Sequence, residues 1–350
     1  MTDLNFVPDE LSELSWEELL EHFDNPKNFN IPDIALQEIK NLEANSFPKH
    51  ATVLLTHGLF AINSEDRKAV VKQVESVKDD TYNILSPKKR AYRLLSNFSD
   101  VWTRKVAKYM FIESGDEWYS KENSANDNEA YEYPENIIIP GSPRIKWDPA
   151  RATDAKDFKR RTDFNENELL PEFYGVNDNS WEESHEIYHT KIPKRLTTLE
   201  KNGKRSITFD IHDTGVRLED QNPEKDTFRP WGYPKMEIGT LDGSSCDPEI
   251  LAFFVEQVEK YFGFSPVVNQ KYKWGYVTKK HGWEARKSLE EAWENPNKRN
   301  VLQIELGRYL YMKESTQEID HEQARKVWAA LRMCIQKTWE KFWEDFQNAA

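Results

Sequence analysis

Cysteine is scarce in this chain of 350 residues, which holds only Cys246 and Cys334. Two cysteines cannot build a disulfide framework or a thiolate zinc site, and free thiols suit a reducing cytosol. No apolar run approaches the roughly 20 residues that a membrane-spanning helix needs. The N-terminus also lacks the basic start and apolar stretch of a secretory signal. We therefore expect a cytoplasmic protein with no membrane partner.

Basic residues are outnumbered, because 48 Lys and Arg stand against 61 Asp and Glu, for a net charge of −13. Proteins that bind nucleic acid need clustered Lys and Arg to contact phosphates, so this balance argues against a nucleic-acid partner. It does not exclude a small anionic substrate, because a local basic pocket can form in an acidic protein. Composition leaves the oligomeric state open.

Short apolar strands alternate with amphipathic helices along the chain. Strand signals lie at 52–55, 137–139, 145–147, 206–212, 267–268, 276–278 and 301–306. Helix signals lie at 184–201, 250–262 and about 320–346. Pro193 is expected to kink or break the first of these helices, and the last aligns Trp328, Leu331 and Ile335 as a core-packing stripe. Strands that alternate with helices favour an α/β layer architecture.

The length suffices for one large α/β domain with insertions. Residues 1–49 are interpreted as a helical N-terminal extension, residues 50–315 as the main domain and residues 316–350 as a C-terminal helix packed on it. The acidic segment 113–135 is expected to be an exposed excursion, and the polar segment 152–181 an insertion or long loop. Either segment could shape the pocket or bind partners.

Ionisable side chains gather where the expected strands end. They are His57, Asp148, Arg151, Asp210, His212 and, within the last strand, Glu305. In open α/β sheets, functional groups collect at the carboxyl ends of strands. Two histidines and a carboxylate that converge there would suit Zn²⁺, which takes three protein ligands and leaves one position for water. The alternative is a set of ordinary hydrogen-bonding residues at strand tips.

A local metal-binding pattern also occurs, because His185, Glu186 and His189 match H-E-x-x-H within a predicted helix. Histidines four residues apart share one helix face and can both bind Zn²⁺, with the Glu as base. The charged surroundings and Pro193 argue against a zincin-type peptidase here. A partly exposed helix that carries two histidines is the simpler interpretation.

Three segments in the last third of the chain carry a longer pattern. Met236–Pro248 contains Gly239-Thr240 and ends in Ser245-Cys246-Asp247; Asn269–Gly282 and Gln303–Met312 follow. In this order and spacing they resemble the N-formylglutamate amidohydrolase family, whose pattern is a Gly-Thr segment leading to S-C-D, then Y-x-G-G-x-x-T-x-x-x-G, then Q-x-E-x-x-x-x-x-Y-M.

Upstream pieces fit the same resemblance, which covers roughly residues 50 to 315. They are His57-Gly58, Asp100, the segment Arg144–Arg151, the pair Tyr188-His189 and the strand end Phe209–His212. The chain departs from the family pattern at Pro149-Ala150, at Asp213, where a Ser usually follows the His, and at Trp274, which replaces the first of two glycines. His57 and Asp100 also lie farther apart than is usual in the family.

The resemblance implies a fold and a mechanism. The family is related to zinc carboxypeptidases, so the implied fold is phosphorylase/hydrolase-like, with three α/β/α layers around a mixed, mostly parallel sheet. His57, Asp100 and His212 would bind Zn²⁺ or another divalent transition metal. Glu305 would be the general base.

The implied substrate is a small anionic N-acyl amino acid of the N-formylglutamate type. Arg144 and Arg151 would hold its carboxylates or polarise the amide oxygen, because a guanidinium binds carboxylate bidentately. The alternatives are a non-catalytic relative of the same fold that binds a ligand, and the zincin-type peptidase. For single residues, Glu305 could instead pair with Arg308, and the arginines could form a salt bridge with Asp148.

Overall fold

The computed structural model describes residues 24–39, 51–56, 136–138, 148–155, 180–201, 205–215, 234–313 and 318–347, together with positions 18, 21 and 22. The predicted site residues His57, Asp100 and Arg144 lie outside the described residues. So do the expected excursion at 113–135, most of 152–181 and the expected strand at 145–147.

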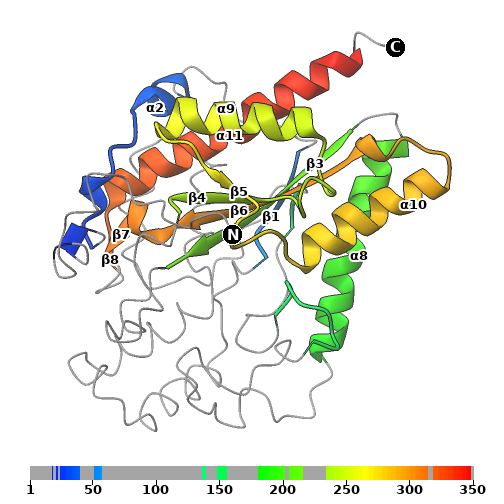
Figure 1. Ribbon diagram of the computed structural model, residues 1–350. Coiled ribbons are helices and arrows are strands. Elements are labelled where there is room, and N and C mark those ends of the chain that lie inside the picture. The colour runs from blue at the N-terminus through cyan, green and yellow to red at the C-terminus, as the bar shows by residue number, and fades with distance from the viewer. Residues whose placement is uncertain are drawn as a thin grey trace, which may run out of the picture.

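A six-stranded sheet in the order β2-β1-β3-β6-β4-β5 forms the centre of the described structure (Figure 1). Its strands are β1 (Thr52–Leu54), β2 (Ile137–Ile138), β3 (Ser206–Thr214), β4 (Met236–Gly239), β5 (Val267–Val268) and β6 (Arg299–Gly307). β2, β1, β3 and β6 are mutually parallel, whereas β4 runs antiparallel to β6 and parallel to β5. The expected α/β fold with a mixed, mostly parallel sheet is confirmed.

Helices cover both faces of this sheet (Figure 1). α9 (Pro248–Phe262) and α11 (His321–Gln347) lie on one face, with the short α2 (Ile34–Ile39) packed against α11. α8 (Ser180–Lys201) and α10 (Ala285–Glu291) lie on the other side. The short elements are η2 (Pro26–Asn28), the π-helical segment η6 (Thr278–Glu284), η7 (Pro296–Lys298), η8 (Arg308–Leu310) and the two-stranded ribbon β7 (Met312–Lys313) with β8 (Glu318–Ile319).

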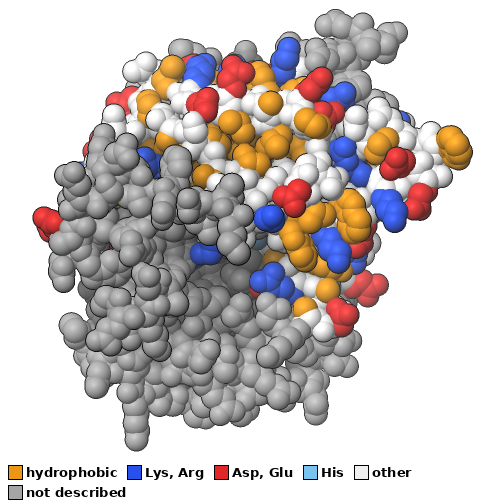
Figure 2. All heavy atoms as spheres, in the orientation of Figure 1, with side chains coloured by type: hydrophobic (Ala, Val, Ile, Leu, Met, Phe, Trp, Pro, Cys, Tyr) orange, Lys and Arg blue, Asp and Glu red, His pale blue; other side chains and the backbone are white. Residues whose placement is uncertain are grey.

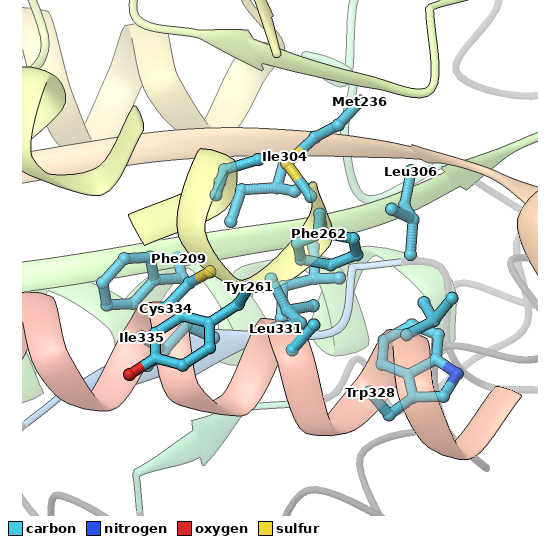
Figure 3. Close-up of a cluster of buried hydrophobic side chains, with 14 of the residues drawn as sticks. Phe209, Met236, Tyr261, Phe262, Ile304, Leu306, Trp328, Leu331, Cys334 and Ile335 are labelled. Atoms are coloured by element: carbon cyan, nitrogen blue, oxygen red, sulfur yellow. The ribbon is translucent and has the colours of Figure 1, made fainter. Parts of the chain in front are cut away.

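The main core lies between the sheet and the α9–α11 layer. Because side chains alternate between the faces of a strand, Phe209 of β3 and Ile304 of β6 point to this layer together (Figure 3). The expected α11 stripe packs against them, and Trp328, Leu331 and Ile335 are fully buried. Burial of each such side chain stabilises the fold by about 1.5–3 kcal/mol. This packing holds the sheet in place, and the opposite face of the sheet carries the polar side chains.

Three local expectations were wrong or incomplete. Residues 276–278 are helical and lead into η6 instead of forming a strand. α8 continues through Pro193 without a break. Proline cannot donate the backbone hydrogen bond of that turn, but the packing of Ile192 and Leu196 against Leu54 in the same buried cluster outweighs this loss. β4 was not anticipated as a strand. Among the described helices, none combines the length and apolarity needed to cross a bilayer.

Candidate active site

Three ionisable side chains form a row across the central strands. The β3–β6 register pairs His212 with Glu305, and the β6–β4 register pairs Glu305 with Glu237. Residues directly opposite on neighbouring strands present their side chains to the same face, with Cβ atoms about 4.5–5.5 Å apart in an antiparallel pair. All three residues are buried, and their apolar neighbours in sequence belong to the hydrophobic core. The sequence therefore concentrates its polar groups on the face opposite α9 and α11.

His212 is oriented by a carboxylate. Its Nε2 lies 3.1 Å from Oδ2 of Asp210, a close contact that lacks hydrogen-bond geometry. The other oxygen of Asp210 accepts a hydrogen bond from the Thr56 hydroxyl, which in turn lies 2.9 Å from the hydroxyl of Tyr188 on α8. Burial, followed by the nearby Asp210, raises the pKa of Tyr188 well above its usual value. This network brings the end of β1 against His212, and His57 is the residue that follows Thr56.

Glu305 is held by its own strand. Gln303 Nε2 donates a hydrogen bond of 2.8 Å to Oε1 of Glu305. The Arg308 side chain, a possible partner of Glu305, donates to Asp213. Asp213 also accepts a hydrogen bond of 3.2 Å from Tyr311. The unusual Asp213 that follows His212 thus has a structural partner on the apolar side of β3.

Glu237 anchors the segment that crosses the site. We call residues 269–276 the strap. Oε1 of Glu237 accepts the backbone N–H groups of Gln270 and Tyr272, both at 2.7 Å. Its Oε2 is buried with no hydrogen-bond partner, and burial raises the pKa of the carboxyl group. Glu237 thereby couples the strap to the row that contains Glu305.

Two glycines allow the strap to lie directly on the sheet. A Cβ on Gly239 would come within 2.3 Å of the Tyr272 carbonyl oxygen, and one on Gly275 within 2.9 Å of Oε1 of Gln303. The side chain of Tyr272 extends from the strap to β3, where its hydroxyl lies 2.9 Å from the hydroxyl of Thr214. The strap therefore spans β4, β6 and β3 at the end that carries His212 and Glu305.

The strap and the first turn of η6 are basic and aromatic. Lysine ammonium groups lie over neighbouring rings: Lys271 over Tyr272 at 5.1 Å, Lys279 over Trp274 at 5.8 Å and Lys280 over Tyr276 at 5.1 Å. In Figure 2, Lys and Arg side chains gather near the centre of the face, beside exposed hydrophobic side chains. A local positive region of this kind suits an anionic ligand despite the acidic composition of the chain.

Arg151 lies on a tightly held turn, which we call the Arg151 loop (residues 148–151). Asp148 is buried and closes the turn, because its Oδ1 accepts the Ala150 N–H at 2.9 Å and its carbonyl accepts the Arg151 N–H at 3.0 Å. The Ala150 carbonyl accepts the backbone N–H of Tyr276 at 3.2 Å. This bond joins the Arg151 loop to the strap.

The H-E-x-x-H histidines do not have the arrangement of a metal site. Nε2 of His189 lies 2.9 Å from the Pro149 carbonyl oxygen, and its Nδ1 lies 2.9 Å from Nε2 of His281. Nε2 of His185 lies 3.2 Å from the carbonyl oxygen of Arg151. Because both nitrogens of His189 are engaged, the zincin interpretation loses its second ligand. Throughout the described residues, no group of three His, Cys, Asp or Glu side chains could hold a metal ion.

The predicted site is thus partly visible. The structure brings His212 and Glu305 together and ties the Arg151 loop to the strap that crosses them, whereas His57, Asp100 and Arg144 lie outside the described residues. The donor chemistry fits part of a zinc site, because metal-bound histidines usually contact a second-sphere carboxylate, as His212 contacts Asp210. Sequence reasoning gave no roles to Glu237 and Gln303. A charged residue inside the short apolar run Met236–Gly239 was the available signal for Glu237.

Fold and site together define a class, an α/β protein with a buried histidine and carboxyl groups side by side on its central strands. Residues 149–312 match the sequence model of the N-formylglutamate amidohydrolase family, and this confirms the resemblance of the chain to that family. His212, Glu305 and Arg151 all lie within the matched region.

Two curated relatives are each similar to a little over a third of the chain. An N-formylglutamate deformylase of Pseudomonas putida is 23% identical over 128 residues, which cover 37% of this chain and 41% of that protein. Another, of Pseudomonas aeruginosa, is 25% identical over 127 residues, which cover 36% of this chain and 41% of that protein. The aligned region thus spans less than half the length of these relatives.

A solved structure supports the fold. The crystal structure of N-formylglutamate amidohydrolase from Ralstonia eutropha JMP134 superposes with a TM-score of 0.51. The superposition covers 86% of this chain and 95% of that chain, at 15% sequence identity. At this identity the likeness shows a shared fold and nothing further.

Proposed function

We propose that this chain is a metal-dependent amidohydrolase that cleaves the amide bond of an N-acyl amino acid of the N-formylglutamate type. The observation that carries the proposal is the register pairing of buried His212 with buried Glu305, within the region that matches the family. The names of the two curated relatives, both N-formylglutamate deformylases, supply the substrate class.

His57, Asp100 and His212 would hold a divalent metal. The metal, when bound, supplies Lewis acidity and lowers the pKa of water from about 16 to about 7. Asp210 supports this assignment, because metal-bound histidines usually contact a second-sphere carboxylate and Oδ2 of Asp210 lies 3.1 Å from Nε2 of His212. The Thr56 hydrogen bond holds Asp210 in place for this role.

Glu305 is the general base in this proposal. It takes a proton from the attacking water as the C–O bond forms, then returns the proton to the amide nitrogen as the C–N bond breaks. With N-formylglutamate the products are formate and glutamate. Gln303 supports this role, because its hydrogen bond to Oε1 holds the Glu305 carboxylate in place.

Arg151, together with Arg144, would bind the carboxylates of the substrate through paired N–H donors. The lysines of the strap add positive charge at the same end of the sheet. A substrate with two carboxylates gives each arginine a partner. Its scissile amide would then lie toward Glu305.

The direct test is release of formate from N-formylglutamate by the protein reconstituted with Zn²⁺. We expect turnover by the wild-type protein and a decrease in kcat of about 10²–10⁴-fold in Glu305→Gln, the usual contribution of a general base. Glu290→Gln is the matched control, because Glu290 is exposed on α10. A reconstituted protein that binds N-formylglutamate without turnover would favour the ligand-binding relative over the enzyme.

A further inference from the structure

The Arg151 loop is held by three consecutive backbone carbonyls. The Pro149 carbonyl faces Nε2 of His189 at 2.9 Å, the Ala150 carbonyl accepts the Tyr276 N–H at 3.2 Å, and the Arg151 carbonyl faces Nε2 of His185 at 3.2 Å. Two of the three donors are thus histidines one turn apart on α8. A loop bound in this way cannot shift without breaking contacts to both α8 and the strap.

The hydrogen-bond directions in this cluster follow from its acceptors. A backbone carbonyl only accepts, so Nε2 of His189 carries a proton and donates to Pro149. Burial, followed by the nearby His281 and His185, lowers the pKa of His189 to about 2, so its ring is neutral and its Nδ1 has no proton. Nε2 of His281 must therefore be the donor in the 2.9 Å contact with His189.

His281 is presented by a rare element. It lies in the π-helical segment η6, and such segments occur often at functional sites. Gly282 packs so closely that a Cβ there would come within 2.6 Å of Cβ of Ser245. Burial, followed by the positive Lys280, lowers the pKa of His281 to about 3, so its ring is neutral at pH 7 and its hydrogen bond to His189 sets the tautomer.

The same loop is mechanically linked to the catalytic strand. Tyr276, which binds the Ala150 carbonyl, is preceded by Gly275, and Gly275 lies against the side-chain amide of Gln303. Gln303 in turn holds Glu305. The distance between Arg151 and Glu305 is therefore set through one short chain of contacts.

We propose that His189, held in one tautomer by His281, is a positioning residue that fixes the Arg151 loop at the spacing from Glu305 that the carboxylate of the substrate requires. This inference rests on the proposed function, because it takes Arg151 as the carboxylate ligand. It gives the H-E-x-x-H histidines a role without a metal. Misplacement of a bound substrate by about 1 Å can cost about 10²-fold in rate, so a small shift of this loop has a large effect.

The test compares His189→Leu, which removes both hydrogen bonds, with His189→Gln, which keeps one donor and one acceptor. We expect His189→Leu to raise KM for N-formylglutamate roughly tenfold or more, with a smaller change in kcat, because the misaligned Arg151 no longer binds the carboxylate well. His189→Gln should recover most of the loss. His281→Leu should change KM in the same direction and provides a second variant if His189→Leu does not fold.

A double-mutant cycle with Arg151→Ala separates positioning from general damage. If His189 acts through Arg151, the effect of His189→Leu on KM disappears in the Arg151→Ala background. An equal increase in KM in both backgrounds, or no increase in either, would overturn the proposal. An unchanged KM in Arg151→Ala alone would also overturn it, because Arg151 would then not bind the substrate.

Calorimetric titration with N-formylglutamate keeps the two hypotheses apart. A wild-type protein that binds this ligand without hydrolysing it contradicts the proposed activity. The positioning role is still supported if His189→Leu binds the ligand more weakly than wild type and His189→Gln binds it with nearly the wild-type Kd. Equal Kd values for wild type and His189→Leu overturn positioning even if turnover is observed. Absence of both binding and turnover in the wild type overturns both.

Discussion

Acid is expected to destabilise this fold through His189 and His281. Their pKa values are lowered to about 2 and about 3 in the folded state, against 6.5 for an unperturbed histidine. Below pH 6.5 the unfolded chain therefore binds a proton at each residue that the folded chain does not. The free energy of unfolding falls as pH falls through the range from 6.5 to about 3, and these two groups have no such effect above it.

The magnitude follows from the same linkage. Each histidine lowers the free energy of unfolding by about 2 kcal/mol between pH 7 and pH 5, or about 4 kcal/mol together. His185, whose pKa is also lowered by burial, adds to the effect in the same direction. Lys280 and Arg299 contribute to the low pKa of His281, so the cluster contains positive groups that oppose a further charge.

Urea unfolding at pH 7, 6 and 5 measures this effect. From pH 7 to pH 5, the wild-type protein should lose about 2 kcal/mol more than His189→Gln, which cannot take up the proton. Ser288→Ala is the control, because Ser288 is exposed on α10 and carries no titratable group, so this variant should keep the wild-type slope. Identical pH slopes in wild type and His189→Gln would refute the assignment of a neutral, buried His189.

Two further changes test the packing around the site. Glu200→Ala should destabilise the fold by about 3–5 kcal/mol in urea unfolding, because it leaves Arg299 buried without the carboxylate that binds both Nε and Nη2, the latter at 2.6 Å; a loss below about 1 kcal/mol would contradict this ion pair. Gly239→Ala should cost about 1–3 kcal/mol, because its Cβ would lie 2.3 Å from the Tyr272 carbonyl and must displace the strap; unchanged thermal stability would show that the strap does not cross Gly239.

The central sheet and the α11 layer were predictable because their sequence signals are local. The apolar runs of β3 and β6 and the stripe of Trp328, Leu331 and Ile335 follow from periods of two and about 3.6 residues. The ends of α9 also carry local signals: the Asp247 side chain accepts the Glu249 N–H, and Gly263 ends the helix at φ 74°. Each of these features depends on residues close together in the chain.

The site was less predictable because it depends on register and on long-range packing. The sequence placed His212 and Glu305 at or near strand ends, but only the β3–β6 register makes them direct neighbours. The role of Glu237 depends on the strap, which returns to β4 from more than 30 residues later. The helical start of η6 was mistaken for a strand, because the β-branched residues Val277 and Thr278 favour strands in isolation.

The H-E-x-x-H pattern shows the limit of motif spacing. Histidines at this spacing do share one face of α8, as the motif requires. That face packs against the Arg151 loop and η6, so both imidazoles bind backbone carbonyls and His189 also binds His281. Spacing predicted the shared face correctly, and tertiary packing decided what the face contacts.

The metal content of the purified protein tests the central claim most directly. Wild type, His212→Ala and His185→Ala would be loaded with Zn²⁺, dialysed and analysed for bound metal by mass spectrometry. The proposed site predicts one zinc per chain in wild type and in His185→Ala, and loss of the zinc in His212→Ala. Zinc that is retained in His212→Ala but lost in His185→Ala, or no stoichiometric zinc in the wild type, would contradict a metal-dependent hydrolase built on His212 and Glu305.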